Sequence, residues 1–292
     1  MSKRAVMEKL IPLARDLKML PPIAARAIEV ADDPDSQLKE LADIIALDAG
    51  LSISILKLAN SPMFPSYAAG KRISCLKMAV TRLGFRQTKQ MILVACYANM
   101  VESMCPDQVE FRSSMSQHGF LTGTICSKLN HLFGLAMQGE EFTAGLLHDV
   151  GRLLLAVSIP NQFSLFDRCD FREGPDVMCM ENEAIDTNHC EVGAWFLGRN
   201  QMSEELISVA KFHHDPYASI RFTRLVALVQ VADILANRHQ SEMGLDELDC
   251  AEISGLRLLE SLGVNDAIER LNAEKETILQ ESVASLQEFR SI

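Results

Sequence analysis

Apolar residues recur every three or four positions along nearly the whole chain, which places them on one face of an α-helix. No segment shows the convincing period-two alternation, bounded by turns, that a half-buried strand needs. The 292 residues are 48% hydrophobic, which suffices for one large domain or two modest ones. We therefore predict a compact, all-α, multi-helix fold.

Proline and glycine mark several expected helix ends. Pro62 cannot donate a backbone hydrogen bond, so the helix before it should stop near Asn60, and Gly84 should close the next one. The stretch MCPDQVE at 104–110 is typical of a hinge. We expect three parts: an N-terminal helical lobe at 1–105, a second helical subdomain at 106–240, and C-terminal amphipathic helices at 241–292.

The sequence predicts a cytoplasmic protein that does not enter a membrane. Its first residues mix charges with apolar positions, unlike a secretory signal. The longest charge-free run near the middle, QMILVACYANMV, is far shorter than the roughly 20 residues of a membrane span. The eight cysteines form no CxxC motif, which is typical of reduced, mostly buried thiols.

Basic residues gather in the first third of the chain, although the net charge is −11. Residues 49–101 contain no acid and seven bases: Lys57, Lys71, Arg72, Lys77, Arg82, Arg86 and Lys89. This segment is either a docking face for an anionic partner or nucleotide, or a surface facing the acidic remainder of the chain. We favour the second interpretation. A nucleic-acid partner is not expected, because no aromatic residues are interleaved to stack on bases.

Two aspartates interrupt apolar segments. Asp149 lies in EEFTAGLLHDVGRLLLAVSIP, which we expect to form one helix over 140–158, and Asp233 lies in LVQVADILA. Burying an ionised carboxylate costs several kcal/mol unless it is paired. Asp149 and Asp233 share this problem, and a cation bound between them would solve it for both.

Five of the seven histidines lie on predicted helices or helix ends near acidic residues: His118, His148, His189, His213 and His214. One divalent cation, or two, shared with Asp149 and Asp233 would satisfy these groups, and imidazole with carboxylate suits Fe, Mn, Zn or Ni. The alternative is structural: a buried histidine can donate to a backbone carbonyl, and a buried aspartate can cap a helix.

The order H, HD, H, HH, D resembles that of the HD superfamily of metal-dependent phosphohydrolases. More closely, residues 13–215 resemble the HDOD family, the HD-related output domains of bacterial signalling proteins. The resemblance rests on ILKLANSPMF, ISCLKMAVTRLGF, AGLLHDVGRLLL, HCEVGAWFL and HHDP, in that order. It implies an HD-like helical fold with an N-terminal helical lobe.

The resemblance also implies roles for individual residues. His118, His148, Asp149 and Asp233 match the positions that hold the first metal in active HD enzymes. His189, His213 and His214 match further ligands of the dinuclear members. Arg152 stands where those enzymes often carry a lysine, and would contact a phosphate.

Two departures argue against the hydrolysis of cyclic-di-GMP. The related phosphodiesterases carry GYP after their histidine pair, whereas this chain reads HHDPYASIRF. They also carry a glutamate four residues before the first histidine, where this chain has Ser114.

Two functions remain. The favoured one is a bacterial signal-transduction output or scaffold module, non-catalytic but able to bind metal. Its signalling partner would dock on the N-terminal lobe at Lys57, Asn60, Lys71, Arg72, Arg82 and Arg86, although Asn60 can simply end a helix. The alternative is a metal-dependent phosphohydrolase acting on a nucleotide or other phosphoester, in which ions activate a water.

Overall fold

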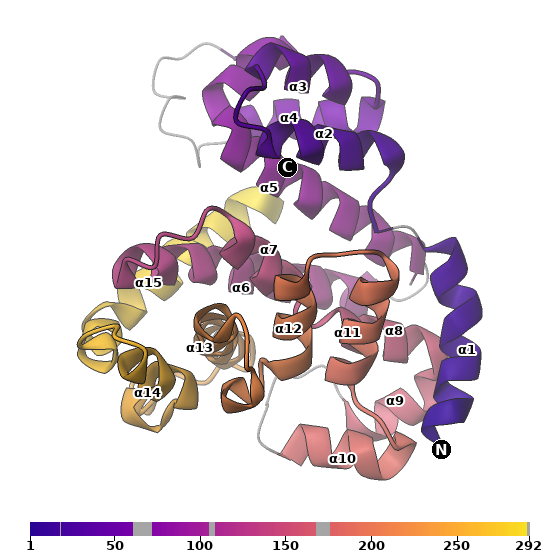
Figure 1. Cartoon of the computed structure of the whole chain (residues 1–292), viewed down its shortest axis with the longest axis vertical. Helices are drawn as coiled ribbons and strands as arrows, with labels where there is room; N and C mark the ends of the chain where they lie inside the picture. The colour runs from indigo at the N-terminus through magenta and orange to yellow at the C-terminus, as the bar shows by residue number, and fades with distance from the viewer. Residues whose placement is uncertain (18, 61–71, 105–108, 168–175, 291–292) are drawn as a thin grey trace. The chain divides into compact units, whose positions relative to one another are not determined.

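The structure is a computed structural model that describes residues 1–17, 19–60, 72–104, 109–167 and 176–290 (Figure 1). Within these ranges it contains helices and no strand, so the all-α prediction is confirmed. Contacts divide the chain into two units. Unit 1 comprises Met1–Leu17 and Met104–Ser282, and unit 2 comprises Lys18–Ser103 and Val283–Ile292.

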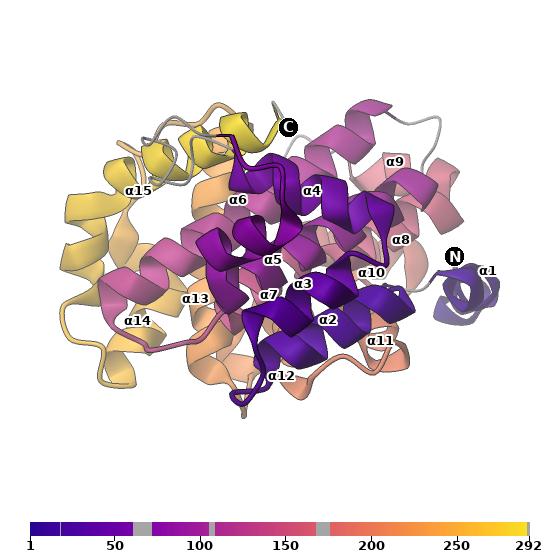
Figure 2. The same cartoon turned by 90° about the horizontal axis from the view of Figure 1, so that it is seen from above.

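Unit 1 is built on α6, which packs against α7 and α13, while α11 packs against both α8 and α12 (Figures 1 and 2). The N-terminal helix α1 contacts α8. The helices of unit 1 are α1 (Lys3–Asp16), α6 (Val109–Phe133), α7 (Glu140–Leu147), α8 (Val150–Ser158), α9 (Pro160–Phe166), α10 (Asp176–Ile185), α11 (His189–Arg199), α12 (Glu204–Phe212), α13 (Thr223–Gln240), α14 (Ser254–Ser261) and most of α15 (Ala267–Arg290).

Unit 2 contains α2 (Pro22–Asp32), α3 (Leu38–Ile45), α4 (Ala49–Ala59) and nearly all of α5 (Leu76–Met104). Gly84 interrupts α5 with a φ of 72°, a left-handed conformation that glycine adopts without the steric cost of a Cβ. The helix end predicted at Gly84 is therefore present as a break inside α5. The predicted ranges 1–105, 106–240 and 241–292 stay a prediction; contacts place α1 in unit 1.

The continuous helix predicted over 140–158 is wrong at its centre. Helix α7 ends at Leu147, and α8 begins at Val150 after Asp149, whose φ of −99° and ψ of 15° are not helical. Asp149 stands at the N-cap of α8, but its side chain accepts no capping hydrogen bond there. The carboxylate of Asp149 instead contacts the Arg152 side chain and the neighbouring histidines.

Glycine allows α8 and α11 to approach closely. A Cβ on Gly151 would lie 1.9 Å from the carbonyl oxygen of His189 and 2.8 Å from the backbone nitrogen of Gly193. No side chain larger than hydrogen fits there, because real Cβ atoms essentially never come within 3.0 Å of another heavy atom. This contact fixes the first turn of α11 beside the first turn of α8.

Candidate metal centre

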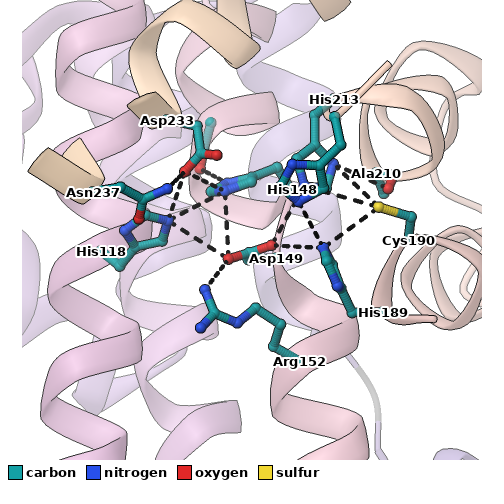
Figure 3. Close-up of polar contacts among 12 residues, drawn as sticks. His118, His148, Asp149, Arg152, His189, Cys190, Ala210, His213, Asp233 and Asn237 are labelled. Carbon is teal, nitrogen blue, oxygen red and sulfur yellow. Dashed lines mark hydrogen bonds and ion pairs between the residues drawn. The ribbon is translucent and has the colours of Figure 1, made fainter. Parts of the chain in front are cut away.

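All seven residues predicted to bind metal lie in one cluster inside unit 1, although their role as ligands stays a prediction. Figure 3 labels all of them except His214. They come from α6, the α7–α8 break, α11, the end of α12 and α13. Six of the seven side chains are buried, and His214 is half-buried. The cluster forms two groups of donor atoms, which we call subsite 1 and subsite 2.

Subsite 1 comprises Nε2 of His118, Nε2 of His148, Oδ2 of Asp149 and Oδ1 of Asp233. The two imidazole nitrogens lie 3.2 Å apart, and they lie 3.1 and 3.3 Å from the Asp233 oxygen. Both lie 3.6 Å from the Asp149 oxygen. Ligands bound at about 2.1 Å to one ion would be separated by roughly 3.0–3.4 Å, so the spacing fits a cation.

The outer ring nitrogens of subsite 1, Nδ1 of His118 and of His148, have hydrogen-bond partners outside the subsite. Nδ1 of His148 lies 2.8 Å from the Gly145 carbonyl oxygen and must donate to it, because a carbonyl only accepts. Nδ1 of His118 lies 2.6 Å from Oε1 of Gln240. In the neutral imidazoles, each Nε2 then presents a lone pair to carboxylate oxygens, which are also acceptors. Such an arrangement is repulsive without a positive charge between the groups, and it is the usual outer-sphere pattern of metal-binding histidines.

Subsite 2 comprises Nε2 of His189, His213 and His214 together with Oδ1 of Asp149. The His189 and His214 nitrogens lie 3.0 Å apart. Oδ1 of Asp149 lies 3.6 Å from Nε2 of His189 and 3.5 Å from Nε2 of His213. These distances again leave room for one ion among the donors.

The outer nitrogens of His189 and His213 in subsite 2 also have hydrogen-bond partners. Nδ1 of His189 lies 2.7 Å from Oε2 of the buried Glu181, which also accepts from the His189 backbone N–H at 2.9 Å. Nδ1 of His213 lies 3.2 Å from the carbonyl oxygens of both Val209 and Ala210. Both rings therefore direct Nε2 toward Asp149.

Asp149 joins the two subsites, since one of its oxygens faces each of them. Its Oδ1 is buried and accepts no hydrogen bond from any described residue, an unusual state for a carboxylate oxygen. A cation in subsite 2 would satisfy this oxygen. The residues present thus fit two divalent ions bridged by one carboxylate.

The electrostatics of subsite 1 favour ionised carboxylates. Burial raises the pKa of Asp149, but His148 and the Arg152 guanidinium outweigh it, so the pKa lies well below its ordinary value. Burial likewise raises the pKa of Asp233, but the neighbouring His118 and His148 outweigh burial, so this pKa also lies well below its ordinary value. Two anionic carboxylates in a buried site create a demand for positive charge.

The electrostatics of subsite 2 also favour positive charge. Burial lowers the pKa of His189, but the Cys190 thiol and the Glu181 carboxylate outweigh it, and the pKa is raised well above its usual value. The pKa of His213 is raised similarly, since Cys190 and Asp149 outweigh burial. Burial and these two rings lower the pKa of His214, which keeps it neutral. The surroundings of His189 and His213 thus favour positive charge.

Arg152 contacts the cluster but is held by two carboxylates. Its Nη1 lies 3.0 Å from Oδ2 of Asp149, while Nε and Nη2 lie 2.8 and 3.0 Å from the two oxygens of Asp167. All three groups are buried. Arg152 therefore orients Asp149, and its predicted contact with a phosphate stays a prediction.

The sequence interpretation missed several supporting residues. Asn237 donates to Oδ1 of Asp233 at 3.0 Å, and Gln240 faces His118. Both share a face of α13 with Asp233 at helical spacing, which could have revealed them. Glu181 and Cys190 gave no comparable signal. Burial raises the pKa of the Cys190 thiol, but His189 and His213 outweigh it and lower the value to about 7.

The residues predicted to bind a partner lie in unit 2, except that Lys71 falls outside the described residues. Lys57, Arg72 and Arg86 are exposed. The amide of Asn60 donates to the carbonyl oxygens of Leu56 and Ile73 at 2.8 and 2.7 Å and accepts from the Ile73 N–H at 2.7 Å. Arg82 donates to the Ala59 carbonyl at 3.1 Å. Asn60 and Arg82 thus hold the local backbone.

Among the described helices, none combines the length and apolar character needed to cross a lipid bilayer.

The chain is similar to a known protein family and to a known protein. A family model described as the HDOD domain matches residues 17–216. An uncharacterized protein of Treponema pallidum (strain Nichols) is 24% identical over 245 residues, which cover 83% of this chain and 46% of that protein. The chain thus matches less than half the length of this relative.

Solved structures share the fold. An HDOD domain protein of unknown function from Geobacter sulfurreducens has a TM-score of 0.75 and 22% identity, covering 97% of this chain and 99% of that one. A candidate phosphohydrolase from Shewanella amazonensis SB2B has a TM-score of 0.67 and 22% identity, covering 94% and 97%. A candidate signal transduction protein from Marinobacter aquaeolei VT8 has a TM-score of 0.70 and 18% identity, covering 99% and 66%. With the family match over most of its length, this chain belongs to the HDOD domain family.

Proposed function

We propose that this chain is a metal-binding signal-transduction module of the HDOD family. The observation that carries the proposal is subsite 1, where two imidazole nitrogens and two carboxylate oxygens face one another. The nitrogen lone pairs are aimed inward because Gln240 and Gly145 accept from the opposite ring nitrogens. These lone pairs and the carboxylate oxygens repel one another, and a divalent cation coordinated by all four atoms would remove the repulsion.

The contacts around the cluster favour a structural or regulatory role over catalysis. Arg152, the side chain that would hold a phosphate, binds two buried carboxylates instead. Releasing it toward a substrate would break both of its hydrogen bonds to the buried Asp167, and breaking a buried ion pair costs several kcal/mol. The candidate signal transduction protein from M. aquaeolei, similar in fold, is consistent with this role.

One observation supports the alternative, a metal-dependent phosphohydrolase. Asp149 presents one oxygen to each subsite, and the candidate phosphohydrolase from S. amazonensis has a similar fold. Two ions held by these residues would supply an activated water and polarise phosphoryl oxygens. In such an enzyme, Glu181 and Gln240 would orient the histidines, and Arg152 would hold Asp149 ionised.

The test is elemental analysis of protein purified without chelators, comparing the wild type with Asp149→Ala. Asp246→Ala is the control, because Asp246 is an exposed aspartate in the same unit. We expect up to two ions per chain in the wild type and in Asp246→Ala, and a loss in Asp149→Ala. An absence of metal from all three proteins after loading with Zn, Mn, Fe or Ni would overturn the proposal.

Metal-loaded protein is then assayed with bis(p-nitrophenyl) phosphate. Turnover by the wild type and Asp246→Ala, but not by Asp149→Ala, would establish the hydrolase. Stoichiometric metal without turnover supports the non-catalytic module.

A further inference from the structure

Cys190 lies against subsite 2 in a position that the histidine and aspartate motifs do not account for. It follows His189 directly, at the second position of α11, and its side chain is 1% exposed. Its Sγ lies 3.4 Å from Nε2 of His189 and 4.0 Å from Nε2 of His213. Cys190, His189, His213 and His214 each offer an atom within 4.8 Å of the others.

These distances are compatible with a shared ion. In a tetrahedral zinc site with Zn–S bonds of about 2.3 Å and Zn–N bonds of about 2.05 Å, sulfur and nitrogen are roughly 3.6 Å apart. The two measured separations lie on either side of that value. Sγ also lies 3.9 Å from Nδ1 of His213 and 3.7 Å from the Met178 thioether, a weak acceptor.

A second observation, independent of the cysteine, indicates a ligand here. Oδ1 of Asp149 is buried, accepts no hydrogen bond from the described residues, and lies 3.5–3.6 Å from the His213 and His189 nitrogens. The rings of His189 and His213 are fixed from behind by Glu181 and by main-chain carbonyls. Subsite 2 therefore has oriented donors and an unsatisfied acceptor whether or not Cys190 takes part.

We propose that the Cys190 thiolate is a ligand of subsite 2, and that this subsite selects a thiophilic ion such as Zn²⁺ or Co²⁺. The inference rests on the proposed metal-binding function and specifies the chemistry of one half of the centre. Three imidazoles, a thiolate and the Oδ1 oxygen of Asp149 form a softer donor set than the two imidazoles and two carboxylates of subsite 1. The two subsites are then chemically unequal, and only subsite 1 suits Mn²⁺ well.

The test is Co²⁺ titration of the full-length metal-free protein, with spectra of the wild type, Cys190→Ser and Cys250→Ser. Cys250 is the matched control, since it is a buried cysteine of unit 1 in the short helix Cys250–Glu252. A thiolate ligand gives a near-ultraviolet sulfur-to-cobalt charge-transfer band, whereas histidine and carboxylate ligands give only the visible bands. We expect the near-ultraviolet band in the wild type and Cys250→Ser, and its loss in Cys190→Ser while visible bands remain.

A second measurement needs no variant, which guards against misfolding of Cys190→Ser. X-ray absorption of the zinc-loaded wild type should contain a sulfur shell at about 2.3 Å. Bound metal with only nitrogen and oxygen neighbours, or a charge-transfer band that survives in Cys190→Ser, would overturn the inference and leave the proposed function intact. No visible cobalt bands and no bound zinc in the wild type would overturn both.

Discussion

The close approach of α8 and α11 supplies a prediction about Gly151. A Cβ at this position would lie 1.9 Å from the His189 carbonyl oxygen, where at least 3.0 Å is needed. In Gly151→Ala the two helices must separate locally by about 1 Å, which typically costs 1–3 kcal/mol in a packed interior. Alanine recovers roughly 0.5–1 kcal/mol of helix propensity. The net loss should be about 1–2 kcal/mol, or roughly 2–8 °C in the unfolding midpoint.

The same displacement carries His189 away from Asp149, because the clash is with the main chain of His189 itself. We therefore expect Gly151→Ala to retain the ion in subsite 1 and to lose or weaken the ion in subsite 2. The matched control is Gly198→Ala near the other end of α11. A Cβ there would meet only Ile207 Cδ1 at 3.7 Å, an ordinary contact. Gly198→Ala should keep both ions and gain up to about 1 kcal/mol in stability.

The assay is thermal unfolding monitored by circular dichroism, combined with elemental analysis of each protein. If Gly151→Ala matched Gly198→Ala in both stability and metal content, the argument would be refuted. That result would mean that the two helices can separate freely, or that His189 does not hold an ion.

Three further expectations follow from the same contacts. Glu181→Gln should weaken metal binding at subsite 2 by about 10- to 100-fold without affecting subsite 1, because Glu181 holds the His189 ring. Competitive chelator titration measures this affinity. The exposed Glu183→Gln is the control and should behave as the wild type. Asn60→Ala should cost about 1–3 kcal/mol, because Ile73 loses two main-chain hydrogen bonds; denaturant unfolding of the exposed control Asn99→Ala should change by less than about 0.5 kcal/mol. Chelation should remove about 2.7 kcal/mol of stability relative to protein at a free metal concentration 100 times Kd; identical unfolding midpoints with and without chelator would contradict it.

The sequence predicts the helices of this fold well and their breaks less well. Helical periodicity identified the all-α class, and Gly84 marked the break in α5 because a left-handed residue is a local property. The break at His148–Asp149 was not predicted, since the apolar pattern runs through it without a proline. It depends on tertiary contacts, including those of Asp149 with Arg152 and the histidines.

The order of motifs located the seven candidate ligands, and the fold brings them together. The order of motifs does not predict how the imidazole rings are oriented, because the hydrogen-bond partner of each Nδ1 atom sets that orientation. The spacing of Gln240 from Asp233 is visible in the sequence, but its contact with His118, and that of Glu181 with His189, depends on how the helices pack. Asn60 illustrates the same limit, since its partner Ile73 lies 13 residues further along the chain and no sequence pattern links the two.

The candidate ligands of the cluster come from five separate places between positions 118 and 233. Ions held by all of them would close several long chain loops at once, so their binding would be linked to the cooperative folding of unit 1 as a whole. Hydrogen exchange should then slow together in α6, α8, α11, α12 and α13 when metal is added. Loss of the ions would lower the stability of all these helices and increase their conformational fluctuations. Metal occupancy could thereby change surfaces of unit 1 that lie far from the site.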